Sequence, residues 1–160
     1  MGQPHVVTLR ATRAGDLDEL FRFRQDPEAS RMAAFTPGDG HDRDAFDARW
    51  ARLIAEPEVD VRTIRADGVI VGDLVRWSDD GATFIGYWID TAHWGEGIAT
   101  RALRLFVDAV HDRPLLAHVA ADNAGSIRVL EKLGFAQAGS AVSFANARGL
   151  DIEERIYRLD

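Results

Sequence analysis

Cysteine is absent from the sequence, and lysine is nearly so. Without cysteine the chain can form no disulfide bond, no zinc site built from thiolates and no covalent intermediate on a thiol. Lys132 is the one lysine, and it follows Glu131 rather than a glycine, so the phosphate-binding motif GxxxxGK[ST] does not occur. A P-loop is therefore excluded, and any group transfer must proceed without a cysteine intermediate.

Long apolar runs and an excess of basic residues are also missing. No run approaches the roughly 18 apolar residues of a membrane span, and the first ten residues lack the basic and then apolar layout of a signal peptide. We therefore expect a cytoplasmic protein with no membrane partner. The 19 Lys and Arg residues against 26 Asp and Glu residues give a net charge of −7. This balance disfavours a nucleic-acid partner, which needs a basic face, and suits a small cationic substrate such as an amine.

The length and composition fit one globular domain. The chain has 160 residues, of which 46% are hydrophobic and 28% are charged. These values lie close to the averages of globular proteins. We expect a single domain over residues 1–160, with its core at about 6–159.

The first half of the chain predicts one strand, two helices and an antiparallel meander. Alternation of apolar and polar residues predicts a strand at 6–10, and Asp16 is a plausible N-cap of the helix that follows. Prolines and glycines at 27–44 predict a mobile connection, and Phe46 and Trp50 mark a second amphipathic helix. Three β-rich runs joined at Asp-Gly turns then predict strands at 59–65, 69–77 and 82–90.

The second half predicts a glycine-rich loop followed by alternating helices and strands. Apolar residues at helical spacing between Ala99 and Val110 predict a helix that stops near Pro114. A short apolar run at 115–119 predicts a buried strand. The remaining expected segments are a helix at 123–133 closed by Gly134, strands at 135–144 and 152–159, and a hairpin loop at 146–151. Together the segments predict an α+β, or mixed α/β, layered fold.

The glycine-rich loop has the composition of an anion-binding site. Gly95 and Gly97 leave the backbone open to a ligand, and the amides from Gly95 to Thr100 can converge on an anion at the start of a helix. A pyrophosphate is the natural ligand of such a loop. The dinucleotide pattern G-x-G-x-x-G is incomplete, because Thr100 stands where its third glycine would be. A simple helix-entry turn is the alternative for this loop taken alone.

A second motif lies one strand further along the chain. Asn123 and Ser126 form N-x-x-S, and L-E-K-L-G-F follows at 130–135. Taken with G-Y-W-I-D at 86–90 and W-G-E-G-I-A-T at 94–100, this chain resembles the GCN5-related N-acetyltransferase (GNAT) superfamily, and within it the RimJ/RimL-like branch of ribosomal-protein N-terminal acetyltransferases. The detailed match covers about the third quarter of the chain, and the element order agrees nearly from end to end.

The resemblance implies a fold and a cofactor. The acyl-CoA N-acyltransferase fold has a mixed, mostly antiparallel sheet of about six or seven strands with about four helices. Its fourth and fifth strands splay apart, and the pantetheine arm of acetyl-CoA (coenzyme A) inserts between them. No metal is implied, and no metal-ligand spacing occurs in the sequence.

The resemblance also implies which residues contact the cofactor. Backbone amides at the end of the fourth strand would bind pantetheine, and those of the glycine-rich loop would bind the pyrophosphate. Trp94 stands where the family usually has Gln or Arg, and Arg128 would meet the adenosine phosphate or be an ordinary solvated helix residue. The expected cofactor-binding set is Trp88, Ile89, Trp94, Gly95, Glu96, Gly97, Ile98, Ala99, Thr100, Asn123, Ser126 and Arg128.

The catalytic groups depart from the family pattern. The tyrosine that commonly protonates the departing thiolate is replaced by Leu130, which leaves Ser126 as the nearest candidate acid or as a plain first-turn residue. A strand glutamate that often serves as base is replaced by Phe84. His118 can relay a proton through water, or it is structural. Tyr87, like the tryptophans beside the loop, is expected to be a groove wall or core residue.

Two readings of function follow from these residues. The first is an acetyl-CoA-dependent N-acetyltransferase that acetylates a primary amine, either a protein N-terminus or a small molecule, directly in a ternary complex. The alternative is a non-catalytic acyl-CoA sensor on the same fold, and a weaker one is a domain that binds ADP alone. We expect a monomer or homodimer. Four acidic residues could face a cationic acceptor: Asp39, Asp42, Asp44 and Asp151. The alternative is that they are ordinary surface residues.

Overall fold

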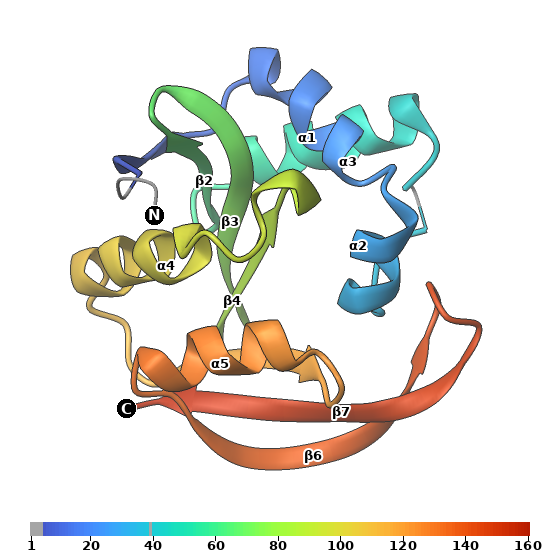
Figure 1. Ribbon diagram of the computed structural model, residues 1–160, viewed down its shortest axis with the longest axis vertical. Coiled ribbons are helices and arrows are strands. Elements are labelled where there is room, and N and C mark those ends of the chain that lie inside the picture. Colours follow the sequence, from blue (N-terminus) through green and yellow to red (C-terminus); the bar gives the residue numbers. More distant parts are fainter. Residues whose placement is uncertain (1–4, 39) are drawn as a thin grey trace.

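The computed structural model describes residues 5–38 and 40–160, so the acidic candidate Asp39 lies outside the described residues (Figure 1). Seven strands form one sheet in the order β1-β2-β3-β4-β5-β7-β6. The strands are β1 (Val7–Ala11), β2 (Asp60–Ala66), β3 (Val69–Asp79), β4 (Ala82–Ile89), β5 (Leu115–Ala120), β6 (Ala136–Ala145) and β7 (Leu150–Leu159). The helices are α1 (Leu17–Phe23), α2 (Pro27–Ala33), α3 (Arg43–Ala55), α4 (Ile98–Ala109) and α5 (Ala124–Lys132), with 3-10 turns η1 (Ala14–Asp16) and η2 (Thr91–His93). The predicted mixed, mostly antiparallel α+β fold is confirmed.

Helices cover both faces of the sheet. The apolar stripe of α4 and Leu130 of α5 pack on one face, against side chains such as Ile85 and Ile89 of β4. The aromatic residues Phe46 and Trp50 of α3 pack with α1 on the other face. Because successive side chains of a strand point to opposite faces, each strand of the meander feeds both clusters. No helix in the described part of the chain is long and apolar enough to cross a membrane.

The two-residue turns of the meander are as expected from their sequences. Asp67 and Gly68 have φ angles of 52° and 83°, and Asp80 and Gly81 have φ angles of 48° and 78°. Two consecutive positive φ angles are the geometry of a tight hairpin turn that matches the twist of its strands. The Asp-Gly pairs therefore fix the register of β2, β3 and β4.

The fourth and fifth strands splay apart. β4 and β5 run parallel, but they pair only through Thr83 with Leu115 and Phe84 with Leu116. β4 continues to Ile89 with β3 as its only paired neighbour, while β5 pairs along its length with β7. A gap therefore opens between the last residues of both strands. β6 and β7 form a long hairpin along one edge of the molecule, and its tip turns toward α2 (Figure 1).

One local prediction was wrong, and a second was confirmed in position but not in its hydrogen bond. The connection at 27–44 was expected to lack structure, but its first part is α2, which raises the count to five α-helices in the described residues. Asp26 caps α2 by accepting hydrogen bonds from the amides of Glu28 and Ala29, and Pro27 occupies the first helical position. An N-cap acid followed by proline is a helix-start signal, and the prolines and glycines further on concealed it.

Asp16 occupies the N-cap position of α1, as expected, but its side chain makes no capping hydrogen bond to that helix. It is 4% exposed and accepts hydrogen bonds from Arg10, Thr63 and the amide of Arg13. Burial alone would raise the pKa of Asp16, but these hydrogen bonds and the charge of Arg10 lower it to about 2. Asp16 therefore joins η1 to β1 and β2 as a buried anion. Asp42, by contrast, caps α3 by accepting a hydrogen bond from the amide of Ala45.

Candidate functional site

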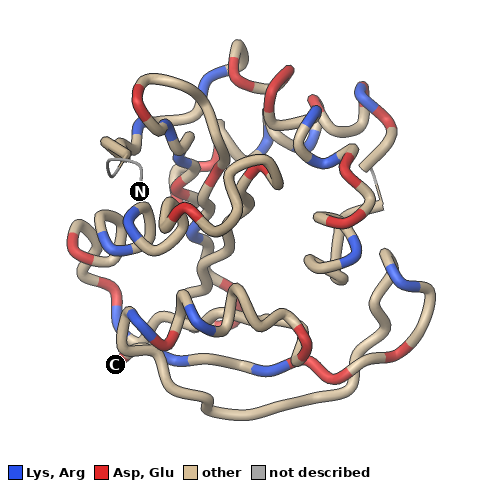
Figure 2. The backbone as a smooth tube through the Cα atoms, in the orientation of Figure 1, with Lys and Arg blue, Asp and Glu red and all other residues tan. Residues whose placement is uncertain are grey.

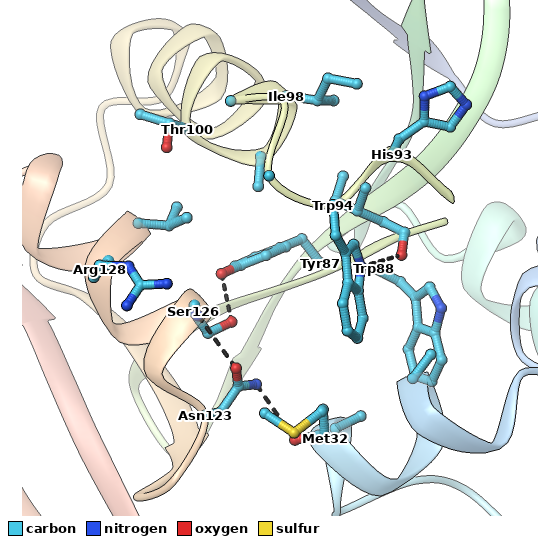
Figure 3. Close-up of a pocket in the computed structure, with 18 of the residues that line it drawn as sticks. Met32, Tyr87, Trp88, His93, Trp94, Ile98, Thr100, Asn123, Ser126 and Arg128 are labelled. Carbon is cyan, nitrogen blue, oxygen red and sulfur yellow. Dashed lines mark hydrogen bonds between the residues drawn. The ribbon is translucent and has the colours of Figure 1, made fainter. Parts of the chain in front are cut away.

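A cavity of about 490 Å³ lies at the splay between β4 and β5. Its walls are the end of β4, the loop that leads into α4, the first turn of α4 and one side of α5 (Figure 3). Ala29, Met32 and Ala33 of α2 close it from the other side. The cavity therefore collects the segments that carry both sequence motifs.

Nearly all of the expected cofactor-binding residues line this cavity. Glu96 is the exception. The expected residues that line the cavity are Trp88, Ile89, Trp94, Gly95, Gly97, Ile98, Ala99, Thr100, Asn123, Ser126 and Arg128. Segments that are more than 30 positions apart in the sequence thus form one surface.

The carboxylate of Glu96 is held by histidines instead. It accepts a hydrogen bond from His93 at 3.1 Å, and it lies 2.8 Å from Nε2 of His5. The hydrogen bond from His93 lowers the pKa of Glu96, and the charge of His5 acts in the same direction. His5 also contacts Asp67 in the turn between β2 and β3, at 2.6 Å. Glu96 therefore links the glycine-rich loop, through His5, to the turn between β2 and β3.

The start of α4 presents unpaired amides to the cavity. Gly97 is the N-cap, with φ of 77°, and no side chain caps the helix. The first amides of a helix have no partner within it and lie at the positive end of its dipole. A Cβ atom built on Gly95 or Gly97 would meet no atom within 4 Å, so the space above the loop is open. This end of the cavity can bind a phosphate group.

Basic side chains add to this end of the cavity. Arg128 and Lys132 of α5 line it, and no acidic side chain is among the described lining residues. Figure 2 shows basic and acidic positions along α5, in a chain with 26 acidic and 19 basic residues. The local positive charge favours an anionic ligand here, despite the negative charge of the whole chain.

Trp94 crosses the end of β4. Its indole Nε1 donates a hydrogen bond to the carbonyl of Ile89 at 3.0 Å, and the residue is 42% exposed. In Figure 3 its ring stands beside Tyr87 and Trp88 in the middle of the cavity. Trp94 therefore occupies a backbone acceptor at the splay and forms a wall of the cavity.

A chain of hydrogen bonds links β4, α5 and α2. The hydroxyl of Tyr87 lies 2.5 Å from Oγ of Ser126, and the amide of Ser126 donates to Oδ1 of Asn123 at 3.2 Å (Figure 3). Asn123 caps α5, and its Nδ2 donates to the carbonyl of Met32 at 3.3 Å. Burial raises the pKa of Tyr87 to about 12, so its hydroxyl stays protonated at physiological pH. Tyr87 lines the cavity as expected, but no local sequence pattern predicts its contact with Ser126.

His118 lies elsewhere. It is not among the residues that line the cavity, and its neighbours on β5, Ala117 and Val119, belong to the cluster under α4 and α5. Because side chains alternate along a strand, His118 faces the opposite side of the sheet from Ser126. There its Nδ1 is hydrogen-bonded to Glu154, and its ring contacts that of Phe84 edge-on, with centroids 5.4 Å apart. The structure does not bring the two candidate catalytic residues together on one face.

The other candidates have structural surroundings. Leu130, at the usual position of the family's acid, is 1% exposed and belongs to the core. Asp44 lies in the first turn of α3, and Asp151 is exposed on β7 opposite Phe144. In the described residues, no group of three or more His, Cys, Asp or Glu side chains could hold a metal ion.

Comparison with known proteins agrees with this geometry. A family model described as an acetyltransferase (GNAT) domain matches residues 7–136. The probable N-acetyltransferase YjcK of Bacillus subtilis (strain 168) is 53% identical over 62 residues, which cover 36% of this chain and 34% of that relative. The uncharacterized N-acetyltransferase p20 of Bacillus licheniformis is 26% identical over 167 residues, which cover 96% of this chain and 92% of the relative.

Solved structures share the fold. RimJ of Mycobacterium smegmatis in complex with CoA-disulfide superposes with a TM-score of 0.78 at 24% identity, covering 96% of this chain and 81% of that one. Spermidine N-acetyltransferase from Vibrio cholerae, in complex with CoA and spermine, superposes with a TM-score of 0.79 at 18% identity, covering 95% of each chain.

Proposed function

This chain belongs to the acetyltransferase (GNAT) domain family and is an N-acetyltransferase with acetyl-CoA as cosubstrate, and from that premise we propose that it passes the acetyl group directly to a primary amine in a ternary complex. The observation that carries the proposal is the cavity at the splay of β4 and β5. It offers an anion-binding helix start at one end and a hydroxyl pair at the other, without any cysteine to carry the acetyl group.

The residues of the cavity suit the parts of acetyl-CoA. The unpaired amides from Gly95 to Thr100 are assigned to the pyrophosphate, and Arg128 to the phosphate of the adenosine. The open end of β4 at Trp88 and Ile89 is assigned to the pantetheine arm. Because the indole of Trp94 already occupies the carbonyl of Ile89, pantetheine would bind through backbone amides or displace that indole.

Ser126 is assigned to the departing sulfur. As the amine nitrogen bonds to the acetyl carbon, the bond from carbon to sulfur breaks and its electron pair passes to sulfur. A cysteine thiol has a pKa of about 8.5, and an alkyl thiol without the neighbouring peptide groups is a weaker acid, so its thiolate is a moderate leaving group that gains from a hydrogen-bond donor near it. The hydroxyl of Ser126 lies in the cavity and can supply that hydrogen bond.

The amine is assigned to the opposite face of the sheet, where His118 lies. The reacting nitrogen must be neutral to attack, and it must lose a proton as the product forms. His118 is paired with Glu154, which is 12% exposed and fixes the orientation of the imidazole. We assign His118 to accept this proton through a water molecule. Cosubstrate and amine would thus approach the splay from different faces, which leaves room for both in a ternary complex.

The acceptor class rests on charge and on the neighbouring structures. The net charge of −7 attracts cationic amines over neutral or acidic substrates. One structural neighbour is a spermidine N-acetyltransferase, and another is RimJ. We therefore propose a primary amine as the acceptor, either on a small molecule or at a peptide N-terminus.

Two-substrate kinetics test the proposal. Acetyl-CoA is varied against spermidine and against peptides with a free N-terminus, and the same peptides with an acetylated N-terminus are the control. Direct transfer predicts intersecting double-reciprocal lines with at least one free amine and no turnover of the blocked peptides. Parallel lines would indicate an acetyl-enzyme and contradict the ternary complex. Binding of acetyl-CoA without turnover of any amine would favour the sensor alternative.

A further inference from the structure

Tyr87 has a position that its role as a cavity wall does not require. Its ring extends from β4 across the cavity floor toward the first turn of α5 (Figure 3). Its hydroxyl lies 2.5 Å from Oγ of Ser126, at the short end of the range for hydrogen bonds between hydroxyl groups. The two residues are 39 positions apart in the sequence. The fold therefore brings a phenol to the one hydroxyl assigned to the departing sulfur.

The direction of this hydrogen bond follows from acidity. A phenol is a stronger acid than an aliphatic alcohol, and it is the better donor of the two. With its pKa at about 12, Tyr87 also remains protonated across the pH range in which the enzyme would work. Either oxygen could donate on geometry alone, and this difference in acidity favours Tyr87 as the donor and Oγ of Ser126 as the acceptor.

The consequence concerns the proton of Ser126. A serine hydroxyl has one proton and two lone pairs, so accepting from Tyr87 leaves its own proton free for another acceptor. The amide of Ser126 is already bonded to Asn123, which fixes the backbone of this first turn. We infer that Tyr87 is a positioning residue, whose hydroxyl donates to Ser126 and thereby turns the serine proton into the cavity toward the departing sulfur.

This inference rests on the proposed role of Ser126 and extends it. Tyr87 need not touch the sulfur, and no proton has to leave its oxygen during the reaction. It acts by excluding the orientation in which Ser126 would donate to Tyr87, and by polarising the serine hydroxyl, since hydrogen bonds in a chain strengthen one another. The sulfur leaves with its electron pair and receives a hydrogen bond from Ser126.

The test measures the acidity of the thiol of bound CoA, which requires no amine. The thiolate is followed by its ultraviolet absorbance during a pH titration, as a difference from the complex with desulfo-CoA, which lacks the sulfur. Four proteins are compared: the natural chain, Tyr87→Phe, Ser126→Ala and the double variant. Tyr87→Phe keeps the ring and removes only the hydroxyl. Calorimetry of CoA binding and thermal unfolding are measured for each protein.

Tyr157 provides the matched control. It is the one other tyrosine of the chain, it is 2% exposed, and it belongs to the core cluster against which Tyr87 packs. It does not line the cavity. Tyr157→Phe therefore removes a hydroxyl from the same core without touching Ser126, and it should leave the titration of the bound thiol unchanged.

The expected result is a coupled effect. Loss of either hydroxyl weakens the hydrogen bond to the thiolate, so Tyr87→Phe should raise the pKa of the bound thiol by about half a unit to one unit. Ser126→Ala should raise it at least as far, and the double variant should match Ser126→Ala. The dissociation constant of CoA should stay within about twofold of the natural chain, because neither hydroxyl is assigned to the phosphates or pantetheine.

Two other results separate the inference from its premise. If Ser126→Ala does not change the thiol titration, Ser126 does not contact the sulfur, and the proposed role of that residue is wrong. If Ser126→Ala raises the pKa of the bound thiol and Tyr87→Phe does not, Ser126 keeps its role and the positioning role of Tyr87 is overturned. The same conclusion follows if Tyr87→Phe raises this pKa by the same amount in the natural chain and in the Ser126→Ala variant. A large loss of CoA binding in Tyr87→Phe would assign the residue to the cavity wall alone.

Discussion

His118 and Ser126 lie on opposite faces of one sheet, so each can be changed without disturbing the surroundings of the other. If His118 accepts the proton of the amine, His118→Gln should lower kcat by about 100-fold, the lower range for a general base. The dissociation constant of acetyl-CoA should not change, because His118 is absent from the cavity. Steady-state kinetics and calorimetry measure the two quantities.

An exposed histidine elsewhere supplies the control. His111 follows α4 and is exposed, so His111→Gln should leave both quantities unchanged. Wild-type kcat in His118→Gln would show that the imidazole beside Glu154 is structural. A parallel loss of acetyl-CoA binding would mean instead that the substitution disturbs the sheet.

Single residues also show what sequence patterns reveal and what they do not. Gly95 and Gly97 were predictable, because both lie in a short stretch between a strand and a helix, and the structure gives each a positive φ angle. The contact of Tyr87 with Ser126 was not, since it joins positions 39 apart whose local patterns are unrelated. The burial of Asp16 was hidden for the same reason, because Thr63 and Arg10 come from two other strands.

At the scale of elements, one buried ion pair joins the end of α1 to the sheet. The guanidinium of Arg24 forms two hydrogen bonds to Asp73 of β3, at 2.7 and 2.9 Å, and lies 4.7 Å from the centre of the Trp88 ring. Asp73 is 1% exposed. Since Asp73 is also the partner of Trp88 in the register of β3 and β4, the pair fixes α1 directly behind the cavity.

Removing one partner of this pair should destabilise the fold. Asp73→Ala would leave Arg24 largely buried without its carboxylate, which typically costs about 3 to 5 kcal/mol of unfolding free energy. Urea unfolding measures the change. The control is Glu19→Ala in the exposed pair with Arg22, where a change within about 0.5 kcal/mol is expected. Equal small losses in both variants would contradict the structural role of the buried pair.

The helices and strands themselves were largely predictable, and α2 shows why one was not. Its start, Asp26-Pro27, is a recognisable cap, but the helix has only seven residues and is followed by Pro37 and Gly38. A helix this short gains little from its own backbone and depends on tertiary contacts. For α2 these include the hydrogen bond from Asn123 to Met32, almost a hundred positions away. No local pattern contains that contact.

At the scale of the whole molecule, buried anions link folding to pH. Asp16 has a pKa of about 2 in the folded chain, against 3.8 for the free side chain. A carboxylate with a lowered pKa adds stability that is complete above about pH 4 and is lost as the pH falls toward 2. Asp16 should therefore contribute about 2 kcal/mol at neutral pH and only about 0.4 kcal/mol at pH 2.

Asp16→Asn tests this dependence. The variant should be less stable than the natural chain at pH 7, and the difference should shrink as the pH falls from 4 to 2. Denaturant unfolding at several pH values measures it. Asp151→Asn, at an exposed position on β7, should follow the natural chain throughout. A difference between Asp16→Asn and the natural chain that is the same at pH 2 and pH 7 would contradict the buried-anion interpretation.

The overall arrangement of the sheet was more predictable than the position proposed for the acceptor. The order of elements and the splayed strands were predictable from the resemblance of two motifs to a family, and the structure confirms the parallel pair that parts after two residue pairs. The position proposed for the acceptor was not predictable, because His118 and its neighbours Phe84 and Glu154 come from three different strands, β5, β4 and β7. The residues of the cosubstrate cavity lie in compact local motifs, whereas those proposed for the amine site are dispersed along the chain.

The central claim is that the cavity at the splay holds acetyl-CoA with its pyrophosphate on the start of α4. Titration calorimetry of acetyl-CoA with the natural chain, Gly97→Asp and Gly149→Asp tests it most directly. Both glycines have positive φ angles, 77° and 70°, and open space around a new Cβ atom, so the backbone strain is matched. Only Gly97→Asp adds a carboxylate beside the unpaired amides. The account predicts binding by the natural chain and Gly149→Asp and none by Gly97→Asp, whereas equal binding by all three, or no binding by the folded natural chain, would contradict it.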